Sequence, residues 1–163
     1  MRTALFPGSF DPVHNGHLEI VERAAKLFDH VVVAAMRNPQ KGEPLFGLEE
    51  RRAMLLEATA HLDNVDVVSL STLVVELARE VHADAIVKGL RAVSDFENEL
   101  QMAQMNFHLS GIDTVFIPSG SECSFIASPL LREVARLGGD VSGLVPPGVA
   151  KRLALLRSPR GAP

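Results

Sequence analysis

The sequence predicts an α/β fold in which a five-stranded parallel sheet is covered by helices on both faces. Short β-rich runs alternate with helical patterns along the chain, which is the pattern of repeated β-α-β units. The run HVVVAAM at 30–36 is continuously apolar, as expected for a strand buried on both faces of a sheet. No internal repeat or proline- and glycine-rich linker interrupts the pattern. We therefore expect a single domain over residues 1–157 and a flexible tail at 158–163.

Each expected element follows from its local pattern. Strands are expected where apolar residues cluster between turn signals, at 3–6, 30–36, 65–69, 83–88 and 113–117. Helices are expected where apolar residues recur every three or four positions, at 16–28, 48–61, 72–82, 94–109, 128–137 and 148–157. Thr72 and Ser94 are expected to cap the third and fourth helices, because their hydroxyls can accept a hydrogen bond from a free N–H of the first turn.

Composition narrows the classes of function. The 163-residue chain has a formal net charge of −4 and scattered basic residues, whereas nucleic-acid-binding proteins usually carry a basic patch, so no nucleic-acid partner is expected. No apolar run approaches the roughly 20 residues that a membrane helix needs, and the N-terminus lacks the long apolar stretch of a signal peptide. Cys123 is the only cysteine, so an internal disulfide is impossible and a cytoplasmic location is expected.

The strongest chemical signal is the segment GSFDPVHNGH at 8–17, which follows the first strand. Gly8 lets the backbone come close to a ligand. Gly16 stands at the start of a helix, whose free N–H groups and dipole attract phosphate. His17 enters that first turn, where its imidazole can donate a hydrogen bond to a phosphate oxygen. A histidine near a helix start is more often a cap or a solvated side chain, but here it follows a glycine-punctuated loop that holds a second histidine, His14.

HNGH at 14–17 resembles the (H/T)xGH signature of the nucleotidyltransferase superfamily of adenylyl and cytidylyl transferases. A wider set of motifs, spread from about residue 2 to residue 156, is similar to the phosphopantetheine adenylyltransferase family. The set comprises PGSFDPVHNGH, Lys41 in NPQKG, LEERRAML, KGLR at 88–91, DFENELQMAQMN at 95–106 and SFIASPLLREVARLGGDV. The four-residue motif marks only the superfamily, whereas the joint set, in order and at matching spacings, is specific to the family.

The resemblance implies a Rossmann-like, doubly wound sheet with the strand order 3-2-1-4-5. It implies reversible transfer of an adenylyl group from ATP to 4′-phosphopantetheine, which gives dephospho-CoA and pyrophosphate in the penultimate step of coenzyme A synthesis. Mg²⁺ is the implied cofactor, coenzyme A a feedback inhibitor and a homohexamer the assembly. In such a sheet, ligands bind where the strand order reverses, and the two strands at that point are followed by GSFDPVHNGH and KGLR.

Residue roles carry over from the family by position. The resemblance implies that His17 contacts the α-phosphate of ATP and stabilises the transition state. It implies that the acceptor is bound by Ser9, Lys41, Val74 and Lys88. It implies that ATP is bound by Ser9, Phe10, His17, Gly89, Leu90, Arg91, Glu99, Cys123, Ser124, Phe125, Ile126, Ala127, Ser128 and Pro129. No cluster of carboxylates marks a protein metal site, so Mg²⁺ is expected to be held by substrate phosphates and water.

The chain departs from the family pattern in its phosphate-binding segments. Lys88 stands where many members have arginine, which keeps the charge but loses bidentate geometry. Ala127 and Pro129 stand where relatives have serines, so two hydroxyls are missing from the loop that precedes the fifth helix. Cys123 is expected to be a packed side chain, because adenylyl transfer needs cations and N–H donors rather than a covalent nucleophile.

Two other functions stay open from the sequence. Another transferase of the superfamily, such as a nicotinamide-mononucleotide adenylyltransferase or a glycerol-phosphate cytidylyltransferase, would share the histidine loop, although KGLR and DFENELQMAQMN favour the phosphopantetheine enzyme. A non-catalytic nucleotide-binding module would have lost catalytic side chains, yet His17, Lys41 and Arg91 are all present.

The helix expected at 94–109 has more apolar surface than one buried face needs. One stripe is formed by Phe96, Leu100, Ala103 and Phe107, and a second by Met102, Met105 and Leu109. The second stripe packs either in the chain's own core or against another subunit, because a wide apolar surface tends to mark a contact.

Overall fold

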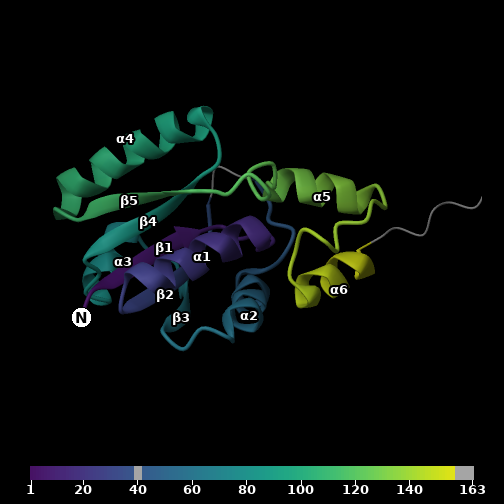
Figure 1. The fold of residues 1–163 in the computed structure, drawn as a ribbon, viewed down its shortest axis with the longest axis horizontal. Coiled ribbons are helices and arrows are strands. Elements are labelled where there is room, and N and C mark those ends of the chain that lie inside the picture. Colours follow the sequence, from purple (N-terminus) through teal and green to yellow (C-terminus); the bar gives the residue numbers. More distant parts are fainter. Residues whose placement is uncertain (39–41, 157–163) are drawn as a thin grey trace, which may run out of the picture.

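The computed structural model describes residues 1–38 and 42–156, in which one parallel sheet is surrounded by helices (Figure 1). The strands are β1 (Thr3–Gly8), β2 (His30–Met36), β3 (Val65–Leu70), β4 (Ala85–Leu90) and β5 (Asp113–Pro118). The helices are α1 (Asn15–Leu27), α2 (Leu48–Thr59), α3 (Val74–Glu80), α4 (Val93–Ser110), α5 (Ser128–Arg136) and α6 (Pro147–Leu155). The expected α/β class is confirmed. Lys41 and the tail expected at 158–163 lie outside the described residues.

The strand order is β3-β2-β1-β4-β5, with every neighbouring pair parallel, as the family resemblance implied. Pairing between β1 and β2 continues to Gly8, and pairing between β4 and β5 continues to Leu90. Pairing between β1 and β4 covers only Ala4 with Ala85 and Leu5 with Ile86. The two halves of the sheet therefore separate toward the carboxyl ends of β1 and β4, which opens a crevice at the point where the strand order reverses.

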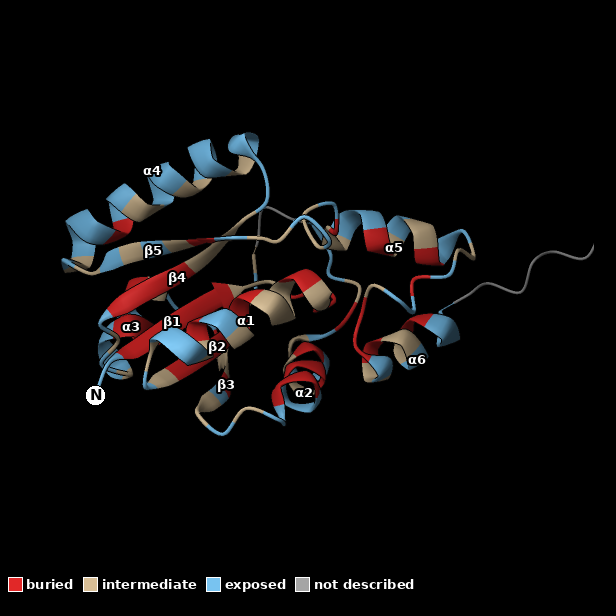
Figure 2. Ribbon diagram, viewed as in Figure 1, coloured by how far each residue is buried: buried red, intermediate tan, exposed pale blue. Residues whose placement is uncertain are grey.

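Alternation along the buried strands places side chains in two cores. Ala4, Phe6, Val31 and Val33 pack with α1 residues in the larger core, which also includes side chains of α2, α5 and α6. Leu5, Val32 and Ala34 pack with α3 residues on the other face. Figure 2 shows β1 buried along its length, whereas α4 is mostly exposed. Among the helices of the described part, none combines the length and hydropathy that crossing a bilayer requires.

Two expected helix caps are wrong. Helix α3 begins at Val74 behind Leu73, whose N–H donates to the Glu76 carboxylate at 3.3 Å, so Thr72 is not the cap. Helix α4 begins at Val93 behind Ala92, without a side-chain cap, so Ser94 lies within the first turn. In α3 a carboxylate three residues into the helix replaces the hydroxyl cap, which is one half of a capping box.

Candidate active site

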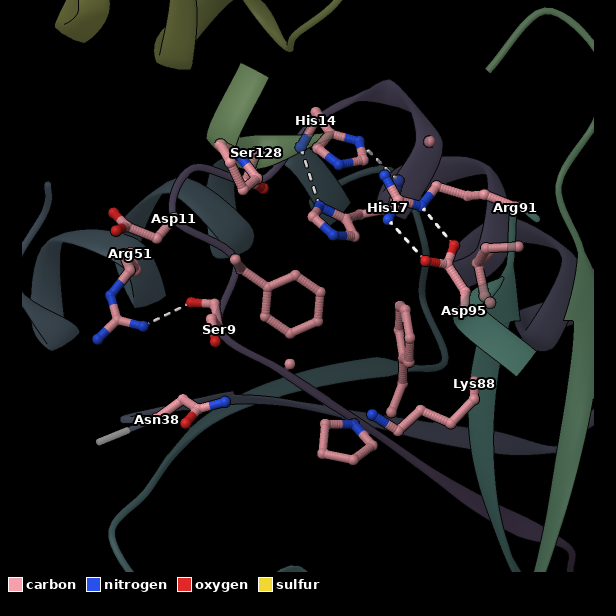
Figure 3. A pocket seen from close by; sticks show the side chains of 18 of the residues that line it. Ser9, Asp11, His14, His17, Asn38, Arg51, Lys88, Arg91, Asp95 and Ser128 are labelled. Carbon is pink, nitrogen blue, oxygen red and sulfur yellow. Dashed lines mark hydrogen bonds and ion pairs between the residues drawn. The ribbon is translucent and has the colours of Figure 1, made fainter. Parts of the chain in front are cut away.

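A cavity of about 600 Å³ lies at the carboxyl ends of β1 and β4, where the sheet separates (Figure 3). Of the residues predicted from the sequence, those that line it are Ser9, Phe10, His17, Lys88, Gly89, Arg91, Glu99, Ser128 and Pro129. The predicted residues outside its lining are Val74, Leu90, Cys123, Ser124, Phe125, Ile126 and Ala127. The crevice therefore joins the two motifs that follow β1 and β4, and the start of α5 closes a third side.

His14 and His17 form a reciprocal cap at the start of α1. The N–H of His17 donates to Nδ1 of His14, and the N–H of His14 donates to Nδ1 of His17, both at 3.3 Å. The two rings are stacked with centroids 3.6 Å apart. A neutral imidazole that accepts at Nδ1 carries its proton on Nε2. Both rings are therefore held in the tautomer that offers an Nε2–H donor.

Burial keeps His14 neutral. Desolvation, with a smaller contribution from the charge of Arg91, lowers the pKa of His14 from 6.5 to about 3, because an imidazolium is disfavoured away from water. A neutral His14 can go on accepting the N–H of His17 throughout the neutral pH range. The first histidine of the motif thus supports the second and fixes the start of α1.

The turn between β1 and α1 is tightly packed around Phe10. Its ring is buried and meets Phe6 and His17 edge-on, at centroid distances of 5.4 and 4.9 Å. Phe10 has a φ of +48°, a left-handed conformation that costs a non-glycine residue about 1–2 kcal/mol. A Cβ on Gly8 would stand 2.8 Å from the Phe10 ring, so this position requires glycine. The His17 ring therefore contacts the Phe10 ring edge-on as well as stacking on His14.

Two cations beside β4 are paired with carboxylates of α4. Arg91 donates from Nε and Nη2 to Asp95 at 3.1 and 3.3 Å, and from Nη1 to the carbonyl of Ile126 at 3.0 Å. Lys88 Nζ lies 3.3 Å from a carboxylate oxygen of Glu99. Asp95 and Glu99 are four residues apart and so share one face of α4. Lys88 and Arg91, both predicted to bind phosphates, are therefore held by carboxylates of α4. From this helix the sequence had predicted only Glu99 as a site residue.

The start of α5 presents fewer donors than the family pattern would. The Ser128 hydroxyl donates to the Pro12 carbonyl at 3.0 Å, which commits its proton within the chain. Pro129 follows in the first turn and has no backbone N–H. Compared with the serine that the resemblance implies at this position, Pro129 lacks an N–H donor as well as a hydroxyl at the end of the helix that would face an anion.

Cys123 is half-buried in the loop between β5 and α5. Burial, followed by the charge of Glu19 and a hydrogen bond to it, raises the pKa of the Cys123 thiol. A thiol kept protonated at neutral pH is a poor nucleophile. This agrees with the expectation that Cys123 packs rather than reacts.

Sequence reasoning missed several side chains that line the cavity. They are Asp11, Arg37, Asn38, Arg51, Asp95, Asn98, Ser119 and Arg132. The sequence signal that could have identified some of them is their place in the family motifs, since Arg51 lies in LEERRAML and Asp95 in DFENELQMAQMN. Counting all described lining residues, five are cationic and three are carboxylates. The cavity therefore suits a ligand with several negative charges.

Comparison with known proteins places this geometry in a family. A family model described as cytidylyltransferase-like matches residues 5–134. A curated protein of a Nocardioides species, named phosphopantetheine adenylyltransferase, is 54% identical over 153 residues, which cover 94% of this chain and 96% of that protein. This chain belongs to the phosphopantetheine adenylyltransferase family. Within that family, the histidine loop after β1 and the KGLR segment at the end of β4 lie where the sequence resemblance placed them.

Solved structures of related fold include more distant proteins. The crystal structure of a lipopolysaccharide core biosynthesis protein from Thermoplasma volcanium is 26% identical, with a TM-score of 0.55 and coverage of 74% of this chain and 97% of that one. A candidate nicotinate-nucleotide adenylyltransferase from Vibrio parahaemolyticus is 19% identical, with a TM-score of 0.65 and coverage of 95% and 93%. The second likeness extends to the fold alone, so the phosphopantetheine adenylyltransferase family remains the closer guide to the site.

Proposed function

We propose that this chain transfers an adenylyl group reversibly from ATP to 4′-phosphopantetheine, with dephospho-CoA and pyrophosphate as products. The single observation that carries the proposal is the 54% identity, over nearly the whole of both chains, to a phosphopantetheine adenylyltransferase. The cavity supports it independently, because adenylyl transfer brings two polyanions together and the lining is rich in cations. The enzyme belongs to coenzyme A biosynthesis.

In the proposed reaction, a phosphate oxygen of the acceptor attacks the α-phosphorus of ATP as the bond to the bridging oxygen breaks, and pyrophosphate leaves with that oxygen. No covalent enzyme intermediate is needed. His17 acts as the catalytic residue, and its Nε2–H donates to the α-phosphate as negative charge builds there. The capping bond from the N–H of His14 to Nδ1 of His17 supports this role, because it leaves the proton on Nε2.

Binding divides between the two sides of the cavity. We assign the acceptor phosphate to Ser9 and Lys88, with Lys41 and Val74 added from the family resemblance. We assign the ATP phosphates to His17, to Arg91 and its neighbours Gly89 and Leu90, and to the start of α5 after the loop at 123–127. Glu99, which the resemblance gives to the ATP nucleoside, is the ion-pair partner of Lys88. In this assignment the acceptor phosphate binds Lys88 and the ATP nucleoside binds Glu99, so the two substrates contact opposite members of one ion pair.

Mg²⁺ fits this site as a substrate-held ion. Each carboxylate among the described lining residues has a partner in the chain: Asp11 accepts the N–H groups of Leu45 and Phe46, Asp95 accepts from Arg91, and Glu99 pairs with Lys88. Within the described residues, no group of three or more His, Cys, Asp or Glu side chains is placed to hold a metal. We propose that phosphate oxygens and water provide most ligands of Mg²⁺. The positive charge of the ion would offset the negative charge of the phosphates.

Three further properties belong to the proposal. A cytoplasmic location is supported by the single cysteine. Feedback by coenzyme A is supported by chemistry, since coenzyme A is the product dephospho-CoA with one more phosphate and would compete for the same cationic cavity. A homohexamer is supported by α4, where Met102, Met105, Phe107 and Leu109 are each about half exposed, an arrangement that tends to mark a contact.

Acceptor profiling tests the proposal against its rivals. Purified protein, ATP and Mg²⁺ are supplied in turn with 4′-phosphopantetheine, nicotinamide mononucleotide and nicotinate mononucleotide, and with glycerol phosphate in the presence of CTP, and pyrophosphate release is measured. Release with 4′-phosphopantetheine alone supports the proposal, whereas release with a nucleotide acceptor or with glycerol phosphate refutes it. Binding of ATP without turnover on any acceptor would instead indicate a non-catalytic module.

A further inference from the structure

Arg51 is a buried cation that the proposed reaction leaves without a task. It lies in the first turn of α2 and is 2% exposed. Its guanidinium donates to three carbonyls: Nε to Phe46 at 3.0 Å, and Nη1 to Met36 at 2.9 Å and to Ser9 at 2.5 Å. Burial lowers the pKa of Arg51, and the negative charge of Asp11 opposes that shift. Burying a guanidinium is costly unless such partners compensate it. The three carbonyls therefore offset the cost of placing this charge in the wall of a ligand cavity.

The bond to Ser9 sets the orientation of one peptide group. Figure 3 shows the Ser9 carbonyl directed toward Arg51. The C=O and N–H of a trans peptide point in opposite directions, so the N–H of Phe10 points away from Arg51. Phe10 also has the unfavourable φ of +48°, which persists only where its surroundings enforce it. Arg51 therefore helps to hold the strained turn whose residues face both substrates.

The other two bonds hold the chain segment that joins β2 to α2. Met36 ends β2 and Phe46 lies just before α2, so one guanidinium ties both ends of the connection. Asp11 reinforces the second end by accepting the N–H groups of Leu45 and Phe46, at 2.8 and 2.9 Å. Asn38, Gly42 and Pro44, which belong to this connection, line the cavity. Arg51 thus joins the turn after β1 to the wall of the cavity on the β2 side.

The ATP side of the cavity is held by other contacts. Arg91 is fixed by Asp95 on α4 and by the Ile126 carbonyl, and neither is a partner of Arg51. Loss of Arg51 should therefore disturb the wall on the β2 side directly and the ATP wall only through the shared turn at Ser9. We therefore expect a change at Arg51 to alter the KM for 4′-phosphopantetheine more than the KM for ATP.

We propose that Arg51 is a positioning residue for the acceptor half of the site, which orients the turn at Ser9 and the two ends of the connection from β2 to α2, at Met36 and Phe46, without touching substrate. The inference rests on the proposed function, which assigns 4′-phosphopantetheine to Ser9 and to Lys41, a residue between β2 and α2 in the sequence. Arg51 acts through backbone carbonyls, and lysine, with a single ammonium, cannot span three carbonyls in the way a planar guanidinium does.

The test is a comparison of KM values for the two substrates in Arg51→Lys. The expected result is a rise of about 10-fold or more in the KM for 4′-phosphopantetheine, because a small displacement of the residues that contact a substrate can weaken its binding by that factor. The KM for ATP should change by less than about 3-fold, because that wall keeps its own contacts. Arg52→Lys, one position along α2, is the matched control and should leave both KM values unchanged.

A purely structural role predicts a different result. Thr59 is buried in α2, where its hydroxyl donates to the Leu55 carbonyl at 2.8 Å, and Thr59→Val should lower the Tm without altering either KM. If Arg51→Lys behaves like Thr59→Val, or raises both KM values equally, the inference is overturned.

Asp11→Asn covers the case in which Arg51→Lys does not fold, because it loosens the same connection at Leu45 and Phe46. Asp11 also pairs with Arg132 of α5 at 3.6 Å, so Arg132→Gln, which removes that contact and keeps the bonds to Leu45 and Phe46, is its control. Asp11→Asn should raise the KM for 4′-phosphopantetheine more than Arg132→Gln does, and an equal rise in the two variants would refute the proposal.

The outcome for the proposed function is read separately. Wild-type protein that releases no pyrophosphate with ATP and 4′-phosphopantetheine would refute the function, and with it the acceptor assignment. Wild-type turnover combined with an unselective Arg51→Lys variant, or with an equal rise in Asp11→Asn and Arg132→Gln, would refute only the positioning role.

Discussion

The two histidines of the loop after β1 divide their work at the scale of single residues. His14 is buried and neutral, and His17 lines the cavity. Each ring accepts the backbone N–H of the other residue at Nδ1, so the backbone amide of each histidine fixes the tautomer of the other ring. In the proposed reaction the functional donor is the Nε2–H of His17, and His14 orients it.

Replacement of His17 by alanine should lower kcat by about 10²-fold or more and leave the KM for each substrate nearly unchanged, because its hydrogen bond strengthens only as charge builds on the α-phosphate. Steady-state kinetics with both substrates measure this. His61→Ala is a suitable control, since His61 is exposed and pairs with Glu22 on the surface. A loss confined to KM would contradict the assigned role.

Stability below neutral pH should report the burial of His14. Its pKa is 6.5 when unfolded and about 3 when folded, so between these values the unfolded chain binds one more proton. The free energy of unfolding should therefore be fully retained above pH 6.5 and fall below it, by about 1.4 kcal/mol per pH unit from this group.

The matched variant is His14→Asn, because asparagine can still cap α1. Urea unfolding at pH 7 and pH 5 should show a loss of about 2 kcal/mol more in the wild type than in His14→Asn. Equal losses in the two proteins would mean that His14 is protonated in the folded state.

Site residues within a distinctive local motif could be predicted from the sequence, whereas the charged residues that pair with or support them could not. The loop from Gly8 to His17 stood out because glycine, hydroxyl and imidazole groups follow a buried strand. Arg51 and Asp95 were missed because a charged residue in a helical pattern is normally solvated. The role of Arg51 depends on carbonyls far along the chain, at Ser9 and Met36, which periodicity does not reveal. Asp95 pairs with Arg91 only four positions away, but that spacing alone does not show that both side chains face a cavity.

At the scale of elements, the N-terminal ends of α4 and α5 face the cavity in different ways. Helix α4 brings the carboxylates Asp95 and Glu99 to Arg91 and Lys88. Helix α5 brings its free N–H groups, but Pro129 removes one of them. We expect the ATP phosphates to displace Asp95 from Arg91 and to gain fewer backbone donors from α5 than a serine at position 129 would allow.

Restoration of the missing donor tests this account of α5. Pro129→Ser supplies an N–H and a hydroxyl in the first turn and should tighten ATP binding by about 10-fold, the value of one hydrogen bond to a charged group. Calorimetric titration with ATP measures the Kd. Pro147→Ser at the start of α6 removes a comparable proline away from the cavity and should leave the Kd unchanged. An unchanged Kd in Pro129→Ser would show that phosphate does not reach the α5 terminus.

Hydrophobic periodicity predicted which segments form helices and which form strands, whereas the first residues of some helices were predicted less accurately. All five strands and six helices that the structure describes overlap their predicted ranges, since the periods of 2 and 3.6 residues dominate the pattern. Thr72 and Ser94 are good capping residues on local grounds, yet α3 and α4 begin elsewhere. Arg91 and Asp95, four residues apart, pair across the start of α4, a contact that capping preferences do not reveal.

For the whole molecule, the chief feature outside the active site is the exposed apolar surface of α4. Met102, Met105 and Leu109, the second apolar stripe, are each about half exposed, and Phe96 and Leu100 of the first stripe are partly exposed. The single chain therefore does not bury the second stripe in its own core, which favours the alternative of a subunit contact.

Light scattering at micromolar concentration should give a mass several times that of one chain, and six times if the family assembly forms. Met105→Glu should lower the mass, because burying an unpaired carboxylate in an apolar contact is costly. Glu97→Gln, on the same helix, is the control. A monomeric wild type would refute the proposed assembly, whereas a mass unaffected by Met105→Glu would move the contact away from α4.

The strand order was available from the family resemblance, but the opening of the sheet was not. Pairing of β1 with β4 is limited to residues near their amino ends, and the cavity lies beyond that pairing. This separation brings the loop after β1, the KGLR segment and α5 around one volume. It accounts for the arrangement of three distant motifs as one site.

The central claim is that the chain adenylates 4′-phosphopantetheine, and a coupled assay tests it most directly. Purified protein is given ATP, Mg²⁺ and 4′-phosphopantetheine, and both pyrophosphate and dephospho-CoA are measured. We predict equal amounts of the two products, dependent on both substrates and lost in His17→Ala. No pyrophosphate and no dephospho-CoA from folded wild-type protein would contradict the claim.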